Sequence, residues 1–248
     1  MEIKIFQSIE DLNIFAAEKF IETGTSAIEK RGRFSVALAG GSTPKSLYQL
    51  LSSDKFKNKI NWKSVFFFFG DERNVLPGND ESNFKMANKN LFQPLQIEDS
   101  NIIRWKTELA DENKIADDYD KKLKEFFNLS ENNFPEFDLI LLGMGDDGHT
   151  ASLFPFTGAL DETDKIAVEN FVEKLETRRY TLTFPAINKA KNIIFLVKGE
   201  DKAETLKKVL QGEFEPQKFP SQNVKPENGK LFWLVDESAA RLLNKTDV

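Results

Sequence analysis

The single histidine of the chain, His149, stands in a loop that otherwise holds mainly glycine and aspartate. The segment GMGDDGHTASLF covers residues 143–154, and no other histidine occurs in 248 residues. Imidazole is the side chain whose unperturbed pKa suits proton transfer near neutral pH, so His149 is a candidate general base. Asp147 lies two residues earlier and is placed to orient the ring and stabilise its cation. The alternative is a structural histidine that caps a helix or bonds a carbonyl group.

A second loop, AGGSTPKSL at residues 39–47, has the residue types that bind phosphate. Gly40 and Gly41 let backbone N–H groups approach an anion without obstruction by a Cβ atom. Ser42 and Thr43 can cap the following helix and donate hydrogen bonds, and the next proline suits a first helical turn. A helix N-terminus attracts phosphate. The spacing differs from that of the nucleotide P-loop. The alternative is a tight turn with a good helix cap.

Candidate cations lie in three further segments. The segment GDERNVLP places Asp71 and Arg73 directly after a phenylalanine-rich run, where Arg73 can meet an anionic group in a fork geometry. Arg178 and Arg179 precede YTLTF, and Lys202 lies within GEDKAETL. Each of these side chains, taken alone, is more often a solvated surface charge than a ligand.

The glycines of the histidine loop also match a dinucleotide-binding pattern. Gly143, Gly145 and Gly148 satisfy G-x-G-x-x-G after an apolar run. Asp146 and Asp147 would then put carboxylates where a pyrophosphate must lie, and like charges there are costly. We therefore predict no NAD or FAD, and expect the glycines to let the chain turn sharply.

Composition excludes several classes of protein. Hydrophobic residues make up 40% and charged residues 30%, as in ordinary globular proteins, and no apolar run approaches the ~18 residues of a membrane span. The net charge is −6 with dispersed lysines and arginines, which argues against nucleic acid as a partner. The absence of cysteine excludes disulfides and thiolate metal sites. The first residues lack the features of a secretory signal. We expect a cytoplasmic protein without metal, cofactor or membrane contact.

The elements that must position these loops alternate between apolar and amphipathic segments. FSVALAGG, VFFFFGDE, FDLILLGMG and NIIFLVKG are short apolar runs that contain glycine at or near their ends, as in strands of a parallel sheet buried on both faces. Ile115, Tyr119, Leu123 and Phe126 recur at helical spacing. Ser8 begins another helix as a cap. KIAVENFV and RRYTLTF are candidates for a strand pair, which would make the main sheet mixed or form a small mixed second sheet.

These patterns predict a doubly wound, mainly parallel α/β fold, Rossmann-like, with helices on both faces. We expect residues 1–248 to form one domain. In open α/β sheets, ligands bind outside the carboxyl ends of the strands. The loops after the four apolar runs would meet at that edge, which predicts a site there.

Blocks of the sequence, in order along the chain, resemble the 6-phosphogluconolactonase family, within the superfamily that also holds glucosamine-6-phosphate deaminase. The blocks are ALAGGSTPKSLYQLL, FFGDERNVLPGNDESNFKMA, DLILLGMGDDGHTASLFP, RRYTLTFPAINKAKNIIFLVKGEDKAETLKKVL and FPSQNVKPENGKLFWLVDESAARLL. Deaminases carry Asp-Glu-Tyr where this chain has Asp-Glu-Arg, and another segment where TASLFP follows His149. Both differences favour the lactonase branch. One departure is Leu76 between Val75 and Pro77, where the family usually has Val-Pro.

The resemblance implies a fold like that of glucosamine-6-phosphate deaminase and hydrolysis of 6-phospho-D-glucono-1,5-lactone in the oxidative pentose phosphate pathway. It implies that His149 activates water and Asp147 supports it. It also suggests a monomer, because family members often are. The implied substrate and phosphate ligands are Gly40, Gly41, Ser42, Thr43, Asp71, Arg73, Arg179 and Lys202. Arg178 is the surface neighbour of that set, and Asp71 binds sugar hydroxyls or orients Arg73.

Two other functions remain open from the sequence. One is an amino-sugar-phosphate deaminase or isomerase, the nearest rival within the superfamily. The other is a non-enzymatic sugar-phosphate sensor, since related folds serve as effector domains of transcription regulators. Such regulators carry a DNA-binding extension, for which this chain has no spare basic segment.

Overall fold

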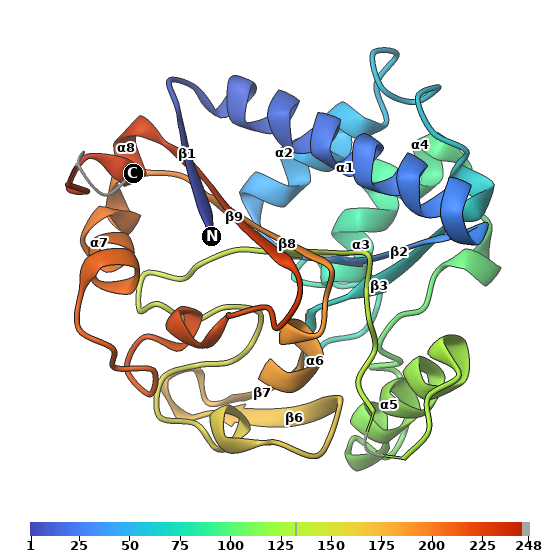
Figure 1. Ribbon diagram of the computed structural model, residues 1–248. Helices are drawn as coiled ribbons and strands as arrows, with labels where there is room; N and C mark the ends of the chain where they lie inside the picture. The colour runs from blue at the N-terminus through green and yellow to red at the C-terminus, as the bar shows by residue number, and fades with distance from the viewer. Residues whose placement is uncertain (132, 245–248) are drawn as a thin grey trace.

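Six parallel strands form the central sheet, in the order β1-β9-β8-β5-β2-β3 (Figure 1). The structure is a computed structural model that describes residues 1–131 and 133–244. The strands are Glu2–Phe6 (β1), Phe34–Leu38 (β2), Val65–Phe69 (β3), Leu139–Leu142 (β5), Asn192–Val197 (β8) and Lys230–Asp236 (β9). From β2 the chain proceeds to β3 on one side and later to β5 on the other. The sheet therefore has its switch point beside β2, where ligands of such folds bind.

The four apolar runs predicted as strands are confirmed as β2, β3, β5 and β8. All five residues of β2 and all four of β5 are buried, as expected for strands covered on both faces. β1 and β9 add two further parallel strands. The prediction of a mainly parallel sheet is confirmed.

Helices cover both faces of this sheet. Figure 1 shows α1 and α2 above the sheet and α5, α6 and a smaller sheet below it. α1 begins after Ser8, whose hydroxyl accepts a hydrogen bond from Asp11 N at 3.1 Å, so the predicted cap is confirmed. The α-helices are Ile9–Arg31 (α1), Ser42–Leu51 (α2), Asn83–Ala87 (α3), Gln93–Leu95 (α4), Asn113–Phe127 (α5), Phe184–Asn188 (α6), Ala203–Gln211 (α7) and Glu237–Ala240 (α8). A π-helical turn covers Asn88–Phe92.

Three antiparallel strands form the smaller sheet, in the order β4-β7-β6. They are Asp71–Arg73 (β4), Ala167–Val172 (β6) and Thr177–Leu182 (β7). The predicted pairing of the last two strands and the predicted small second sheet are confirmed, but that sheet is antiparallel rather than mixed. Gly70 joins the sheets, because its N–H donates to Leu38 O at 2.9 Å and its carbonyl accepts from Leu182 N at 2.8 Å.

Two buried tyrosines hold the backbone where β2 and β3 end. The hydroxyl of Tyr48, from α2, accepts from Ala39 N at 3.0 Å and donates to Ala39 O at 2.8 Å. The hydroxyl of Tyr119, from α5, does the same with Phe69 N at 2.8 Å and Phe69 O at 2.9 Å. Burial raises the pKa of both phenols, so each keeps the proton that its donated bond needs. We call these contacts the tyrosine clamps.

Within the described residues, no helix combines the length and the apolar character needed to cross a bilayer.

Candidate active site

A pocket of about 180 Å³ opens at the switch point of the central sheet. Its walls come from the loops that follow β2, β3 and β5, as predicted from the carboxyl ends of these strands. Gly40, Gly41, Asp71, Arg73 and His149 line it together. The loop after β8 lies outside this lining. This loop leads into α7, whose Thr205 hydroxyl donates a hydrogen bond to Asp146 O in the histidine loop at 2.6 Å.

His149 and Asp147 form a close pair at this pocket. His149 Nδ1 lies 2.6 Å from Asp147 Oδ1, and the same oxygen accepts the backbone N–H of His149 at 3.1 Å. Because Nδ1 faces a carboxylate, the neutral ring carries its proton there and presents an unprotonated Nε2. In the part of the chain that the structure describes, no hydrogen bond engages Nε2. The pair is thus arranged to accept a proton at Nε2.

The surroundings of Asp147 favour its charged form. Burial works to raise the pKa of this carboxyl, but the hydrogen bond and charge of His149, together with Lys174, lower the pKa overall. Lys174 Nζ donates to Asp147 Oδ2 at 3.2 Å, and this contact raises the pKa of the lysine. The other side of the imidazole stacks on Phe154 with ring centroids 4.0 Å apart. The ring is therefore held by a carboxylate at its edge and an aromatic at its face.

Glycines in the histidine loop make room for this pair. A Cβ atom at residue 145 would overlap His149 Nδ1 and Cε1 and lie 2.9 Å from Asp147 Oδ1. Gly148 has φ +81°, and a Cβ there would lie 3.0 Å from the Phe219 ring. These contacts support our interpretation that the glycines make room for Asp147 and His149. The packing of this loop thus accounts for Gly145 and Gly148 of the G-x-G-x-x-G pattern.

The loop after β2 enters α2 through Gly41, which has φ +98°. Gly41 occupies the cap position, so Ser42 and Thr43 are the first two helical residues. The prediction that their hydroxyls cap the helix is wrong, because the left-handed turn at the glycine starts the helix before them. Ser42 is exposed and Thr43 is buried, and neither lines the pocket. The predicted place of the proline in the first turn is confirmed.

Asp71 is buried at the pocket wall and is held by protein groups. Its carboxylate accepts from the Ser152 hydroxyl at 2.7 Å and from Asn83 Nδ2 at 3.1 Å. Arg73 Nη1 donates instead to the carbonyl of Glu81 at 3.0 Å, so in this structure that carbonyl, rather than Asp71, orients Arg73. Asp71 thus links the histidine loop, through Ser152, to the loop after β3.

The neighbouring Glu72 is a structural carboxylate. It is 2% exposed and accepts hydrogen bonds from the backbone N–H groups of Arg73, Asn83 and Phe84 and from the Ser82 hydroxyl. Burial raises its pKa, while the backbone donors oppose that shift. These bonds fix the start of α3 against β4, which places Asn83 beside the pocket.

Two arginines lie directly opposite each other in the smaller sheet. Arg73 of β4 pairs with Arg179 of β7. Burial, and then the charge of Arg73, lower the pKa of Arg179. Like charges at such positions destabilise a sheet, so an anion between them would be favourable. Arg178 instead pairs with Glu169 at 3.0 Å, which fits its predicted role as a surface neighbour.

Lys202 stays outside the pocket. It ends a short 3₁₀ turn before α7, and its Nζ lies 3.0 Å from Asp201 Oδ2. Five of the predicted site residues line one pocket, namely Gly40, Gly41, Asp71, Arg73 and His149. Two others lie outside the lining: Asp147 contacts His149, and Arg179 pairs with Arg73 in the smaller sheet. Ser42 and Thr43 adjoin Gly41 without lining it.

Four residues of this site were absent from the sequence-based prediction. They are Asn83, Ser152, Phe154 and Lys174, each of which touches a predicted residue. Ser152 and Phe154 lie in the same loop as His149, whereas Asn83 begins α3 and Lys174 lies in a 3₁₀ turn between β6 and β7. None of the four carries a spacing signal of its own. Among residues 1–131 and 133–244, no group of three or more His, Asp or Glu side chains is placed to hold a metal ion.

The chain resembles known proteins over most of its length. The family model described as glucosamine-6-phosphate isomerases/6-phosphogluconolactonase matches residues 7–233. A 6-phosphogluconolactonase of Synechocystis sp. is 41% identical over 220 residues, which cover 88% of either chain. The solved structure of 6-phosphogluconolactonase from Trypanosoma brucei is 27% identical with a TM-score of 0.87, covering 98% of both chains.

A monomeric glucosamine-6-phosphate deaminase shares the fold, with a TM-score of 0.81 at 21% identity, over 98% of this chain and all of that one. This neighbour confirms the predicted similarity of fold. The match of the family model over most of the chain, and the identity to the lactonase relative, establish the assignment. The chain belongs to the glucosamine-6-phosphate isomerase/6-phosphogluconolactonase family.

Proposed function

We propose that this protein hydrolyses 6-phospho-D-glucono-1,5-lactone to 6-phospho-D-gluconate. The observation that carries the proposal is the Asp147–His149 pair at a pocket that His149 and Arg73 both line, with Nε2 of the ring free of hydrogen bonds among the described residues. Relatives from 31% to 41% identical, in bacteria, plants and the rat, are named as lactonases for this substrate. The chemistry of the pair fits that reaction, because a lactone is an activated ester and needs no nucleophilic side chain.

The position of the imidazole supports the following reaction. A water molecule attacks the carbonyl carbon of the lactone ring while His149 Nε2 accepts a proton from that water. The tetrahedral intermediate then collapses with cleavage of the bond between this carbon and the ring oxygen, which receives the proton from Nε2. General acid–base catalysis of this kind contributes roughly 10²–10⁴-fold. Asp147 keeps the ring oriented and supports its cation, as the carboxylate of a catalytic triad does.

The carbonyl oxygen gains charge during the attack and needs donors. Gly145 N already donates to His149 O at 2.9 Å, so it is not available in this geometry. The backbone around Gly41, at the N-terminus of α2, lines the pocket and is our candidate. This assignment leaves the histidine loop to supply the base and the loop after β2 to supply the donors.

The phosphate serves as a handle that holds the lactone in register. We assign it to Arg73 and Arg179, whose opposed guanidinium groups gain from an anion between them. Ser42 and Thr43 remain candidate donors at the start of α2. Lys202 would reach the phosphate only after leaving Asp201, so we place it as an outer contact.

We further propose that one chain forms the whole active unit, without a metal or cofactor, in the cytoplasm. The smaller sheet supplies Arg73 to a pocket of the larger one, which supports a single domain. A deaminase activity is not favoured, because the relatives with higher identity are named as lactonases.

The test is continuous hydrolysis of freshly generated 6-phosphogluconolactone, corrected for spontaneous opening. His149→Ala should lower kcat by roughly 10²–10⁴-fold with a smaller change in KM. Arg179→Met should mainly raise KM for the phosphorylated lactone and spare the unphosphorylated one, and Lys202→Ala should do so more weakly. Unchanged turnover in His149→Ala would remove the base from the mechanism, and ammonia release from glucosamine 6-phosphate would indicate the rival activity instead.

A further inference from the structure

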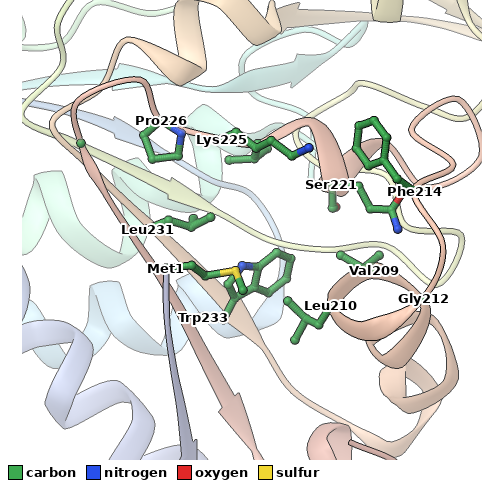
Figure 2. A pocket seen from close by; sticks show the side chains of 13 residues that line it. Met1, Val209, Leu210, Gly212, Phe214, Ser221, Lys225, Pro226, Leu231 and Trp233 are labelled. Carbon is green, nitrogen blue, oxygen red and sulfur yellow. The ribbon is translucent and has the colours of Figure 1, made fainter. Parts of the chain in front are cut away.

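A second pocket lies between α7, β9 and the segment 212–229, and shares no lining residue with the site above (Figure 2). Its volume is about 380 Å³, within the ~300–1,000 Å³ that small-molecule sites occupy. Most of its lining is apolar, including Val209, Leu210, Val224 and Leu231. A pocket of this size and character can enclose a small organic molecule.

Trp233 contributes an unused hydrogen-bond donor to this pocket. The side chain is 2% exposed, and its ring stacks on Phe195 with centroids 3.8 Å apart. Its Nε1 is buried and has no hydrogen-bond partner among the described residues. Buried indole N–H groups usually have an acceptor. Figure 2 shows the side chains of Trp233 and Met1 pointing toward each other. Met1 is 76% exposed, so it can move aside for an acceptor atom.

Lys225 lies on the opposite side of the pocket from Trp233 in Figure 2. Its Nζ sits 3.7 Å from the centroid of the Phe214 ring, and no ion pair joins it to a carboxylate in the described part of the chain. None of the 13 lining residues is acidic, although Asp and Glu outnumber Lys and Arg by 40 to 34 in the chain. The one charged side chain of the lining is therefore a cation.

The other polar side chains of the lining are already engaged. The Ser221 hydroxyl donates to Gly148 O at 2.8 Å, and Gln222 Nε2 donates to Lys208 O at 3.0 Å. Gln222 Oε1 accepts from Glu215 N at 2.7 Å. The free polar capacity thus consists of two donors, the indole N–H and the ammonium, at opposite sides of an apolar space.

The rim carries exposed apolar surface. Phe214 is 59% exposed and Met1 is 76% exposed, and both border this one pocket. Exposed apolar side chains gathered at a concave surface are typical of binding sites. They would cover an apolar molecule once it had entered.

We propose that this pocket binds a small amphipathic organic acid. The ligand has a flat apolar body, a carboxylate that meets Lys225 at one end, and an uncharged oxygen acceptor that meets the Trp233 indole at the other. The proposal does not depend on the lactonase activity, because the two pockets have separate linings.

The three tryptophans provide the test, since each gives one indole N–H signal in a proton–nitrogen correlation spectrum. Trp233→Phe identifies the relevant signal by removing it while keeping an aromatic ring against Phe195. The probe is 4-acetylphenylacetate, with a carboxylate and a ketone at opposite ends of a benzene ring. Titration should move the Trp233 signal downfield to saturation and leave those of Trp62 and Trp105 in place.

Matched ligands and variants separate the contacts. The methyl ester of the probe should bind about two- to fivefold more weakly. The 4-isopropyl analogue, which lacks the acceptor, should bind about two- to tenfold more weakly, without the downfield shift. Lys225→Met should bind the acid and the ester with equal affinity. Lys230→Met changes a residue of β9 outside the lining and should leave the affinity for the acid unchanged. Val209→Phe should abolish binding by filling the pocket.

Three results would overturn the proposal. A Trp233 signal that does not respond to the probe excludes the site. Equal affinity of the acid and its ester for the unaltered protein excludes an anionic ligand. Unchanged binding to Val209→Phe shows that the probe sits elsewhere.

Discussion

Gly145→Ala should disable the active site without unfolding the protein. A Cβ atom at this position would overlap His149 Nδ1 and Cε1 and lie 2.9 Å from Asp147 Oδ1, whereas ordinary contact begins at 3.4 Å. The ring is a side chain with 26% of its surface exposed, so it can swing away where backbone could not. The chain therefore tolerates the alanine, but the imidazole leaves its position against Asp147.

The size of the effect follows from this displacement. The ring must retreat by roughly 1 Å or more, and a misplacement of that size costs about 10²-fold in rate, or ~2.7 kcal/mol in the activation barrier. We expect kcat for 6-phosphogluconolactone to fall by about that factor. The free energy of unfolding in urea should stay within about 1 kcal/mol of the parent, because only side chains have to move.

Gly143→Ala is the matched control within the same loop. A Cβ atom there meets nothing within 4 Å, and the backbone has no left-handed φ, so kcat should be retained. The lone histidine also gives a single set of imidazole signals, whose shift reports directly on its contact with Asp147. If Gly145→Ala kept the kcat of the parent, the requirement for this close contact, and our account of the loop, would be refuted.

Three further outcomes are expected. Lys174→Met removes the hydrogen bond from Lys174 Nζ, one of the causes of the lowered pKa of Asp147, so the pKa of this carboxyl should rise toward its ordinary value; an unmoved carboxyl signal in a carbon-13 pH titration would show that the lysine is a bystander. The pKa of Asp147 is lowered in the folded protein, so its carboxylate stabilises the fold above its usual titration range and loses this effect on acidification. The difference in unfolding free energy between the parent and Asp147→Asn should therefore narrow below about pH 4, and a constant difference would contradict the shift. We propose that Arg73 and Arg179 share the anion, so inorganic phosphate should raise Tm of the parent more than that of Arg179→Met; equal shifts would place the phosphate elsewhere.

The elements of the fold that could be predicted from the sequence are those with a local pattern of apolar residues. β2, β3, β5 and β8 are buried runs, and such runs are visible in sequence. β1 is an edge strand with a partly exposed pattern, which resembles many surface segments. The pairing of β6 with β7 was also visible in sequence. The third strand of their sheet, β4, pairs with β7 from a distant part of the chain, and no local pattern indicates such a pairing.

The same distinction holds for the site. Asp147 and His149 are two residues apart, so their partnership could be predicted from sequence. Ser152 and Asp71 are 81 residues apart, and Lys174 is 27 residues from Asp147. Such contacts arise only when separate loops meet. The capping role predicted for Ser42 and Thr43 is wrong, because Gly41 occupies the N-cap position of α2 with φ +98°. Which residue of this loop begins the helix depends on the direction in which the chain leaves β2, and the sequence does not show that direction.

The tyrosine clamps also constrain the order in which this protein can assemble. The last backbone groups of β3 bond to the phenol of Tyr119, 50 residues further along the chain, rather than to a neighbouring strand. That end of the strand reaches its final geometry only when α5 has docked. The catalytic edge should therefore mature late in folding, and the amide hydrogen of Phe69 should exchange with solvent whenever α5 detaches, even while the centre of the sheet stays protected.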